Sequence, residues 1–478
     1  MAAQSSKLSI EQLPDDVLLE IMRHLGRQDI FTCRLVCKKL GALALHPDVW
    51  RQRGLHLQFP SEFVWACPVL RLAPCLDWLV AELPTEGCQL AYTITRCAVS
   101  CLNLDVQPSG STHAAAMIRN QEALGRLRDL EVSMPPSPSA VLLGTTALAS
   151  GLEKLTVTGI VHCAPNTMAS VLQHRAACTP SLKYFSCERS TSEADPFVHF
   201  VLATHAATLE DVNLDSCCHS DERGCPYSAA TVPLLAEIVN LRSLECPLLP
   251  GLEALAARES LTTLIINVCE SPERPAVMGA WQLLRRAKQL RDVTLIYMAP
   301  LDSGVADVGG EPLVRALVSS GPSRLESLTM VTTGSFDSPE QRLSLLRPVL
   351  GVLPSLPALR TLHLDDVSDE LLSGITPDAV PALERLVLRP LGAARPVPRH
   401  CAHAWLHKDA VKKLSIGIPS LQFLVVPSVP KNCPGDRLCD ACALDCDCDV
   451  RQWVIKDSQV GSGVGCYPCT LMQRNKCE

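Results

Sequence analysis

A short hydrophobic pattern recurs along most of this 478-residue chain and limits the folds that the chain can adopt. The pattern is an apolar residue, two variable residues, an apolar residue, one variable residue and a third apolar residue. Neighbouring copies are on average about 29 residues apart, a spacing that is typical of repeat proteins. The twelve copies start at Val99, Leu127, Leu152, Leu182, Leu209, Leu241, Leu261, Leu290, Leu325, Leu359, Leu383 and Leu421.

Each copy predicts one short strand, because its last two apolar positions alternate as they do in a half-buried strand. Helical stretches lie between the copies, such as "PFVHFVLATHAATLE" and "MGAWQLLRRAKQL". One such unit cannot bury its own apolar face, whereas stacked units can. We therefore expect an α/β fold, in which a leucine-rich-repeat solenoid over residues 96–430 curves into a horseshoe with its strands inside. An ordinary helical solenoid without strands is the alternative.

Four cysteines fit this repeat. Cys187 and Cys246 occupy an apolar strand position, so we expect them in the core. Cys217 and Cys269 follow three residues after a repeat's last apolar position, where leucine-rich repeats place Asn or Cys to cap the turn.

The stretch "LPDDVLLEIMRHLG" from Leu13 predicts an amphipathic helix that begins near Pro14 and ends at Gly26. We expect a second helix with Asp29 as N-cap that runs through Leu40, and a third short turn at "HPDVWRQRG". Three elements in so short a segment rarely form a sufficient core alone. The apolar face of the first helix therefore needs a partner.

The stretches "LPDDVLLEIMRHL" and "DIFTCRLVCKKLGALALHPDVW" resemble an F-box over about residues 10–54. With the repeats, the chain resembles the leucine-rich-repeat class of F-box proteins. The resemblance implies a substrate receptor of a Skp–cullin–F-box ubiquitin ligase, which binds a Skp-type adaptor and, through it, cullin and RING subunits. The positions that match the adaptor-binding motif are Leu13, Pro14, Val17, Leu18, Ile21, Leu25, Val36, Cys37 and Leu40. We expect Leu19, Leu35 and Trp50 to pack inside.

We predict no enzymatic activity, because the chain lacks the G-x-S-x-G, P-loop and H-E-x-x-H motifs. The resemblance implies that the ubiquitin-transferring chemistry lies in other subunits, so this chain would act by proximity. The alternative is a leucine-rich-repeat scaffold or interaction protein without a ligase role, in which the N-terminal helices only cap the array.

The concave face of the solenoid is the predicted site for a protein substrate, whose identity the sequence does not give. Residues beside the strand leucines point into this face, and in the first six copies the charged ones among them are acidic, with Lys154 as the one basic residue. A basic segment of the substrate would complement them, although charges on a sheet face can also be merely solvated. The candidates are Asp129, Glu131, Asp211 and Asp215; in the last copy we also expect Phe423 on this face.

The C-terminal residues 431–478 are rich in cysteine and contain two Cys-x-x-Cys pairs. Two such pairs can complete a tetrahedral zinc site, which would stabilise a segment with few large apolar residues. The predicted ligands are Cys439, Cys442, Cys466 and Cys469. An iron–sulfur cluster would use the same ligands, and a disordered or disulfide-linked tail would use none. No cofactor is otherwise required.

The net charge of −7 disfavours nucleic acid and anionic membranes as partners. We find no secretory signal and no membrane-spanning run, so we expect a cytoplasmic or nuclear protein with mostly reduced cysteines. The expected domains are the F-box at 8–55, a linker and N-terminal cap at 56–95, the repeat array at 96–430 and the tail at 431–478.

Overall fold

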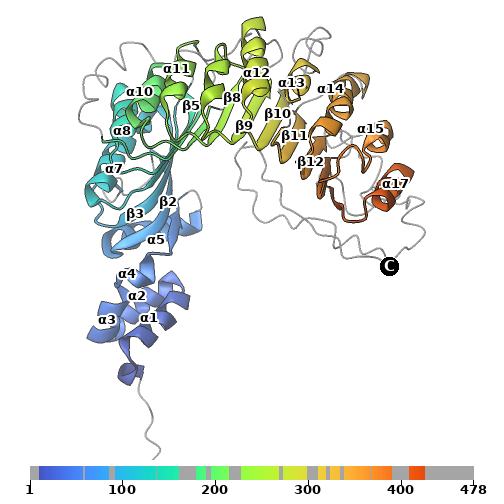
Figure 1. Ribbon diagram of the computed structural model, residues 1–478. Helices are drawn as coiled ribbons and strands as arrows, with labels where there is room; N and C mark the ends of the chain where they lie inside the picture. The colour runs from blue at the N-terminus through green and yellow to red at the C-terminus, as the bar shows by residue number, and fades with distance from the viewer. Residues whose placement is uncertain are drawn as a thin grey trace, which may run out of the picture. The chain divides into compact units, whose positions relative to one another are not determined.

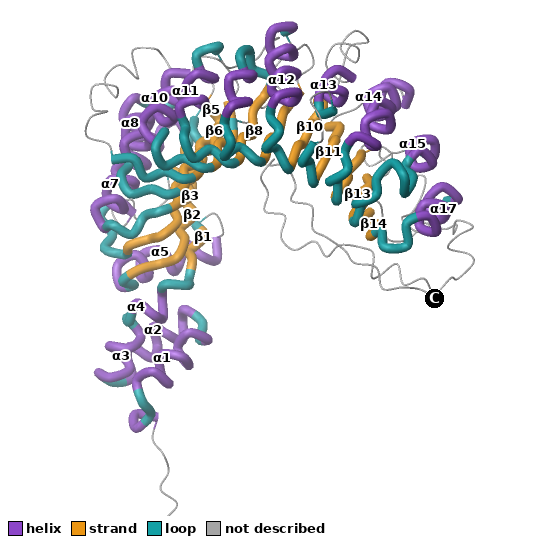
Figure 2. Tube along the Cα trace, viewed as in Figure 1, coloured by secondary structure: helices purple, strands orange, loops and turns teal. Residues whose placement is uncertain are grey.

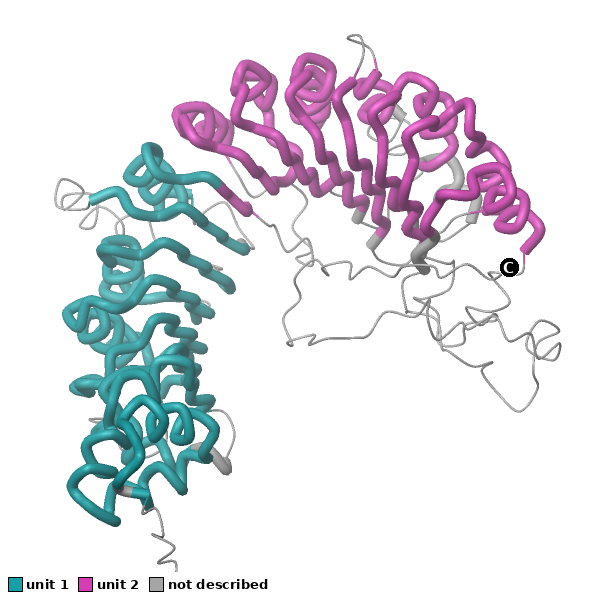
Figure 3. The backbone as a smooth tube through the Cα atoms, turned by 60° about the horizontal axis from the view of Figure 1, so that its bottom comes forward, with its two compact units in different colours: residues 1–210 teal, residues 211–478 magenta. Residues whose placement is uncertain are grey.

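The structure is a computed structural model, which divides into two compact units, residues 1–210 and 211–478 (Figure 3). The structure describes residues 10–57, 60–84, 92–135, 137–160, 179–189, 195–214, 228–268, 273–298, 311–318, 323–333, 339–365, 368–389 and 408–425. The predicted zinc ligands and the turn cysteines Cys217 and Cys269 lie outside these residues.

The first unit begins with short helices (Figure 1). They are η1 (Ile10–Gln12), α1 (Asp15–His24), α2 (Arg27–Val36), α3 (Lys38–Ala44) and α4 (Pro47–Trp50). The predicted second helix is therefore two helices, because Cys37 is extended and its Sγ accepts a hydrogen bond from the backbone N–H of Leu40, at 3.4 Å. Gly26, and not Asp29, is the N-cap of α2.

A parallel sheet follows these helices in the first unit. Its elements are β1 (Gly54–His56), α5 (Pro60–Leu72), β2 (Cys75–Leu83), β3 (Ala98–Val106), η2 (Pro108–Gly110), α7 (Ser111–Leu124), β4 (Asp129–Ser133), α8 (Ala140–Leu148), β5 (Lys154–Ile160), β6 (Tyr184–Arg189) and α10 (Asp195–His205). Strands β1 to β6 pair in chain order, and each pair is parallel.

The sheet begins before the expected start of the array at residue 96. Leu76, Leu79 and Ala81 in β2 pair with the first, second and third apolar positions of the copy that starts at Val99. They are all 0% exposed. The segment 54–83 therefore contributes two further strands, which the predicted division assigned to the end of the F-box and to the linker and cap.

The second unit continues the same alternation. Its elements are β7 (Asp211–Asn213), α11 (Thr231–Glu237), β8 (Ser243–Pro247), η5 (Leu252–Ala257), β9 (Thr263–Val268), α12 (Arg274–Arg286), β10 (Asp292–Met298), α13 (Glu311–Ala316), β11 (Ser327–Thr333), α14 (Pro339–Val352), η7 (Leu353–Ser355), β12 (Thr361–Asp365), α15 (Asp369–Gly374), β13 (Arg385–Arg389), α17 (Asp409–Gly417) and β14 (Gln422–Val425). Strands β7 to β14 pair in parallel in chain order.

In each unit the strands form one layer and the helices another (Figure 2). The apolar positions of the repeat fill the space between them: Leu102, Leu130, Leu264 and Leu328 are all 0% exposed. Burying each such leucine stabilises the fold by roughly 1.5–3 kcal/mol. The chain is thus a mixed α/β protein, in which a helical region is followed by a solenoid-like parallel sheet.

Cys187 and Cys246, which we expected in the core, are both 0% exposed. Among the described residues, no helix is both long and apolar enough to span a membrane.

Candidate partner-binding surfaces

Helix α1 divides its apolar residues between the inside and the outside of the helical region. Leu18 and Met22 are buried at 3% and 2% exposure, and α1 packs against α3 and α4. Pro14 is exposed, and Val17 and Ile21 on the outer side are 40% and 45% exposed. This outer side carries apolar side chains that the described chain does not cover.

The end of α2 exposes two further apolar residues, Leu35 at 82% and Val36 at 65%. The ammonium group of Lys39, on the following turn, donates a hydrogen bond to the carbonyl of Leu13 at 2.8 Å and lies 3.1 Å from the carboxylate of Asp15. This contact joins the α2–α3 corner to the start of α1. We call the exposed and half-buried apolar residues of these two segments the helical apolar surface: Leu13, Pro14, Val17, Ile21, Leu35 and Val36.

The predicted adaptor-binding set agrees with this surface only in part. Leu18 and Leu40 are 3% and 7% exposed, so they form the helical core and are not available to a partner. Leu25 and Cys37 are half-buried.

The expectation that Leu35 packs inside is wrong. The Phe31 ring lies against that of Trp50 instead, with centroids 5.5 Å apart, and α2 ends one residue after Leu35. Trp50 is 0% exposed as expected, and Leu19 is half-buried.

Arg53 joins the helical region to the first strand. Its Nη2 donates hydrogen bonds to the carbonyls of Met22, Arg23 and Leu25, at 3.0, 2.8 and 2.8 Å. These are carbonyls at the C-terminus of α1, where a positive charge also complements the helix dipole. Its Nε donates to the carbonyl of Val49 at 2.7 Å. Burial, with the nearby Arg27 charge, lowers the pKa of the Arg53 guanidinium.

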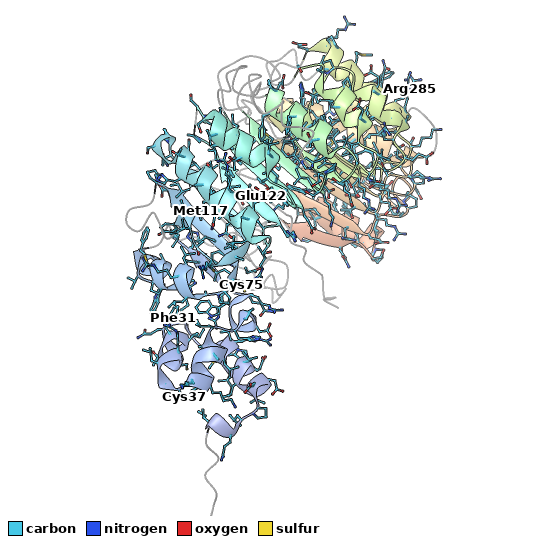
Figure 4. The ribbon with its side chains drawn as sticks, turned by 90° about the vertical axis from the view of Figure 1, so that its left-hand side faces the viewer. Phe31, Cys37, Cys75, Met117, Glu122 and Arg285 are labelled. Carbon is cyan, nitrogen blue, oxygen red and sulfur yellow. The ribbon has the colours of Figure 1, made fainter. Side chains whose placement is uncertain are left out.

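Aromatic side chains extend this junction into α5. Phe31 stacks on Trp65 of α5, with centroids 6.0 Å apart and planes 7° from parallel. Figure 4 shows Phe31 at the solenoid end of the helical region and Cys37 at its opposite end. Arg27 donates to the carbonyl of Gly54, and a Cβ at Gly54 would overlap the indole ring of Trp78. The helical region and the first strands therefore share one packed core.

The second candidate surface is the solvent side of the sheet in the first unit. Asp129 and Glu131 alternate with the buried Leu130 and Val132 along β4, so both carboxylates lie on this side. Lys154 on the neighbouring strand lies 3.3 Å from the Asp129 carboxylate. The other oxygen of that carboxylate, Oδ1, is buried and accepts no hydrogen bond.

Crowding changes the ionisation of this group of side chains. Burial raises the pKa of the Glu131 carboxyl, and the neighbouring Asp129 charge adds to the rise, while Lys154 opposes it. The ammonium of Lys154 also lies 5.5 Å from the centroid of the Tyr184 ring. The predicted acidic face thus exists on β4, with one basic side chain that neutralises part of it.

The other two predicted acidic residues belong to the second unit. Asp211 is half-buried at the start of β7 and pairs with Ser243, and Asp215 lies outside the described residues. Residues that pair with one another from strand to strand form a row across the sheet, and in the row that begins at Asp211 most side chains are uncharged. The row continues with Ser243, Thr263, Asp292, Ser327, Thr361 and Arg385.

Phe423 has another backbone register than expected: it pairs with Leu386, an apolar position of the repeat, and not with Arg385. The face on which its side chain lies stays a prediction. The last copy is therefore one residue out of the predicted register.

The predicted zinc site falls outside the described residues and stays a prediction. Within the described part of the chain, no group of three or more His, Cys, Asp or Glu side chains is placed to hold a metal ion.

Comparison with known proteins identifies the helical region. Residues 10–56 match the family model described as F-box-like. Among solved structures, one similar chain comes from a crystal structure of the Rad7 and Elc1 complex in yeast. It is 13% identical, covers 80% of this chain and 94% of its own, and has a TM-score of 0.39. No curated protein sequence matches this chain. The resemblance to an F-box is confirmed for residues 10–56.

Proposed function

We propose that this chain is the substrate-recognition subunit of a Skp–cullin–F-box ubiquitin ligase, and that its solenoid is of the leucine-rich-repeat class. In this role it is not an enzyme. It binds a Skp-type adaptor through the helical apolar surface and, through that adaptor, cullin and RING subunits. The observation that carries the proposal is the exposed apolar surface on an F-box-like region.

The energetic argument concerns the side chains that the free chain leaves in water. Fully burying one large aliphatic side chain contributes roughly 1.5–3 kcal/mol. Val17, Ile21, Leu35 and Val36 are each at least 40% exposed. An adaptor that covers them gains the share of this free energy that corresponds to their exposed area, which explains why they are apolar.

The junction supports a positioning role. Arg53, Phe31 and Trp65 join the helical region to the first strands by direct contacts. A substrate bound to the sheet of the first unit is therefore held at a fixed position relative to the adaptor-binding helices. Holding two reactants in a fixed geometry is itself a large contribution to rate.

We propose the solvent side of the first unit's sheet as a substrate-binding face. Its acidic residues on β4 would attract a basic segment of the substrate. Asp211 on β7 and Asp215 belong to the same proposal, but the residues that pair in a row with Asp211 include the uncharged Ser243 and Thr263, so this part of the sheet supports it less.

The test of adaptor binding uses the full chain and a purified Skp-type adaptor, with the dissociation constant measured by calorimetry. Ile21→Asp places a charge in the proposed interface without disturbing the core, because Ile21 is 45% exposed. We expect it to weaken binding about a hundredfold, as for an interface hot spot. Val141→Asp is the matched control, since Val141 is also 45% exposed but lies on α8.

If the wild-type chain does not bind the adaptor, the ligase proposal is wrong and a scaffold role replaces it. The substrate face has its own test: Asp129→Lys with Glu131→Lys should reduce substrate capture and leave adaptor binding unchanged. Glu153→Lys is the matched control, because Glu153 is exposed and pairs with Lys183 at 2.8 Å just before the next strand.

A further inference from the structure

The residues that directly precede the strands β8 to β13 form a row along one edge of the sheet in the second unit. The backbone N–H of Thr262 donates a hydrogen bond to the carbonyl of Arg242 at 2.9 Å, and the N–H of Arg291 donates to the carbonyl of Thr262 at 2.8 Å. The same hydrogen bond recurs from each of these residues to the next. We call them the strand-start row: Arg242, Thr262, Arg291, Glu326, Arg360 and Glu384.

Basic and acidic side chains alternate in the strand-start row from Arg291 to Glu384. The guanidinium of Arg291 lies 3.4 Å from the carboxylate of Glu326, and that of Arg360 lies 3.0 Å from the carboxylate of Glu384. Such exposed ion pairs contribute little to stability. The alternation therefore serves mainly to keep like charges from lying beside one another.

The first unit shows where an acidic side chain lies at this edge of a sheet. Glu153 directly precedes β5, and its carboxylate lies between two basic side chains. It is 4.0 Å from Nε of Arg128, which precedes β4, and 2.8 Å from the ammonium of Lys183, which precedes β6. A carboxylate at this position thus interacts with the basic residues of both neighbouring repeats.

The alternation in the strand-start row stops at Thr262. This neutral residue stands between Arg242 and Arg291, whose side chains are both exposed. Neighbouring strands are about 4.8 Å apart, so a carboxylate over Thr262 would be within reach of both guanidinium groups. The row therefore offers two basic side chains with the spacing that surrounds Glu153 in the first unit, but the residue between them has no carboxylate.

Two further basic residues lie in the turns that precede β9 and β10. The side-chain amide of Gln289, which directly follows Lys288, donates to the carbonyl of Arg258 at 2.7 Å and holds these turns together. Arg285 and Arg286 are not counted, because they end α12, where a positive charge complements the helix dipole. We call the remaining four basic residues the basic edge: Arg242, Arg258, Lys288 and Arg291.

We propose that the basic edge binds an acidic segment of a partner protein, with one carboxylate of this segment over Thr262, between Arg242 and Arg291. Complementary charge selects such a partner. Glu259 and Asp292 are exposed in the same turns; they would oppose the dense negative charge of nucleic acid, whereas a peptide with spaced carboxylates can avoid them. The basic edge is opposite in charge to the acidic face on β4, so this inference goes beyond the proposed function and does not depend on it.

The test measures binding of a fluorescein-labelled peptide to the full-length chain by fluorescence anisotropy. The peptide has six glutamates, each separated from the next by a serine. We expect binding that weakens as salt rises, and none to the same peptide with glutamine in place of glutamate. Thr262→Glu supplies the chain's own carboxylate, as Glu153 does in the first unit, and should weaken peptide binding about tenfold. Thr262→Gln, which has the same size without the charge, should bind as wild type does.

Charge reversal tests the rest of the basic edge. Arg258→Glu with Lys288→Glu should weaken peptide binding by more than about tenfold, because it replaces attraction by repulsion. Lys412→Glu with Lys413→Glu on α17 is the matched control, since both lysines are exposed in the same unit and the net charge changes equally. This control should bind nearly as wild type does, and thermal unfolding confirms that each variant is folded.

Four results would overturn the inference. The first two are equal binding of the glutamate and glutamine peptides, and equal affinity of Thr262→Glu and Thr262→Gln. A single-stranded oligonucleotide of equal charge that binds more tightly than the peptide would assign the basic edge to nucleic acid. Tighter peptide binding after Asp445→Asn with Asp447→Asn would assign it to the C-terminal residues of this chain. None of these results bears on adaptor binding, so the proposed function stands or fails separately.

Discussion

Replacing Arg53 with alanine should open the C-terminus of α1 selectively. The side chain makes four hydrogen bonds, two of them to α1 carbonyls and one to the carbonyl of its C-cap, Leu25. A hydrogen bond from a charged donor contributes about 1.5–3 kcal/mol when its partner cannot find water. The sum is smaller here, because Nη2 has two N–H groups for three carbonyls and the carbonyl of Arg23 is exposed. We expect a loss of about 2 kcal/mol in local stability.

Hydrogen exchange measured by mass spectrometry is the suitable assay, because it reports local opening free energies. A loss of about 2 kcal/mol corresponds to roughly 30-fold faster exchange in peptides from α1. Arg51→Ala is the matched control. Arg51 is two residues away, its side chain is 54% exposed and its guanidinium pairs with the carboxylate of Asp48, so its loss should change exchange little.

The result that would refute the reasoning is specific. Equal exchange of α1 amides in Arg53→Ala and Arg51→Ala would show that water replaces the guanidinium at no cost. Faster exchange throughout the first unit, α7 included, would show instead that Arg53 supports the whole unit and that the cap of α1 is not a local element.

Three further expectations follow from particular contacts. Gly54→Ala should destabilise the chain by about 1–3 kcal/mol in thermal unfolding, because a Cβ there overlaps the Trp78 ring, and much less in a Trp78→Ala background, where the space is free. Burial lowers the pKa of His205 to about 4. The contribution of the neutral imidazole to folding stability should therefore be complete above the ordinary pKa of 6.5 and be lost as pH falls towards about 4. His205→Gln should flatten this part of the pH–stability curve, and an unchanged curve would contradict the assignment of this pH dependence to His205. From the sequence alone, we expect zinc in the full-length protein by elemental analysis, and Cys439→Ser with Cys442→Ser should remove about one ion per chain; a zinc content near zero in the wild type would contradict this.

The repeat pattern was sufficient to predict most strands of the solenoid. Each of the twelve copies contains one strand, from β3 to β14, because alternating apolar side chains can be buried only in an extended chain against a helical layer. Strands β1 and β2 escaped prediction. The third apolar position of β2 is Ala81, which is small and gives a weak hydrophobic signal, and β1 has only three residues.

The errors in the candidate site have local causes that a pattern of apolar residues does not carry. Leu35 has the spacing of a core residue, but Phe31 already fills the place against Trp50. The break at Cys37 depends on an extended backbone at one residue. The acidic residues on β4 were predicted on the correct side of the strand, whereas the ion pair between Asp129 and Lys154 depends on the register between β4 and β5.

The junction changes how the helical region should be regarded. The predicted boundary at residue 55 falls inside β1, where Gly54 is covered by Trp78 and its carbonyl accepts from Arg27. Phe31 belongs at once to the helical core, through Trp50, and to the solenoid, through Trp65. A mutation in this core should therefore impair both the helical apolar surface and the substrate-binding face of the sheet, whereas a mutation at Ile21 or Glu131 should impair only one of them. Defects in adaptor binding and substrate capture that always occur together identify the junction, and separable defects identify the surfaces.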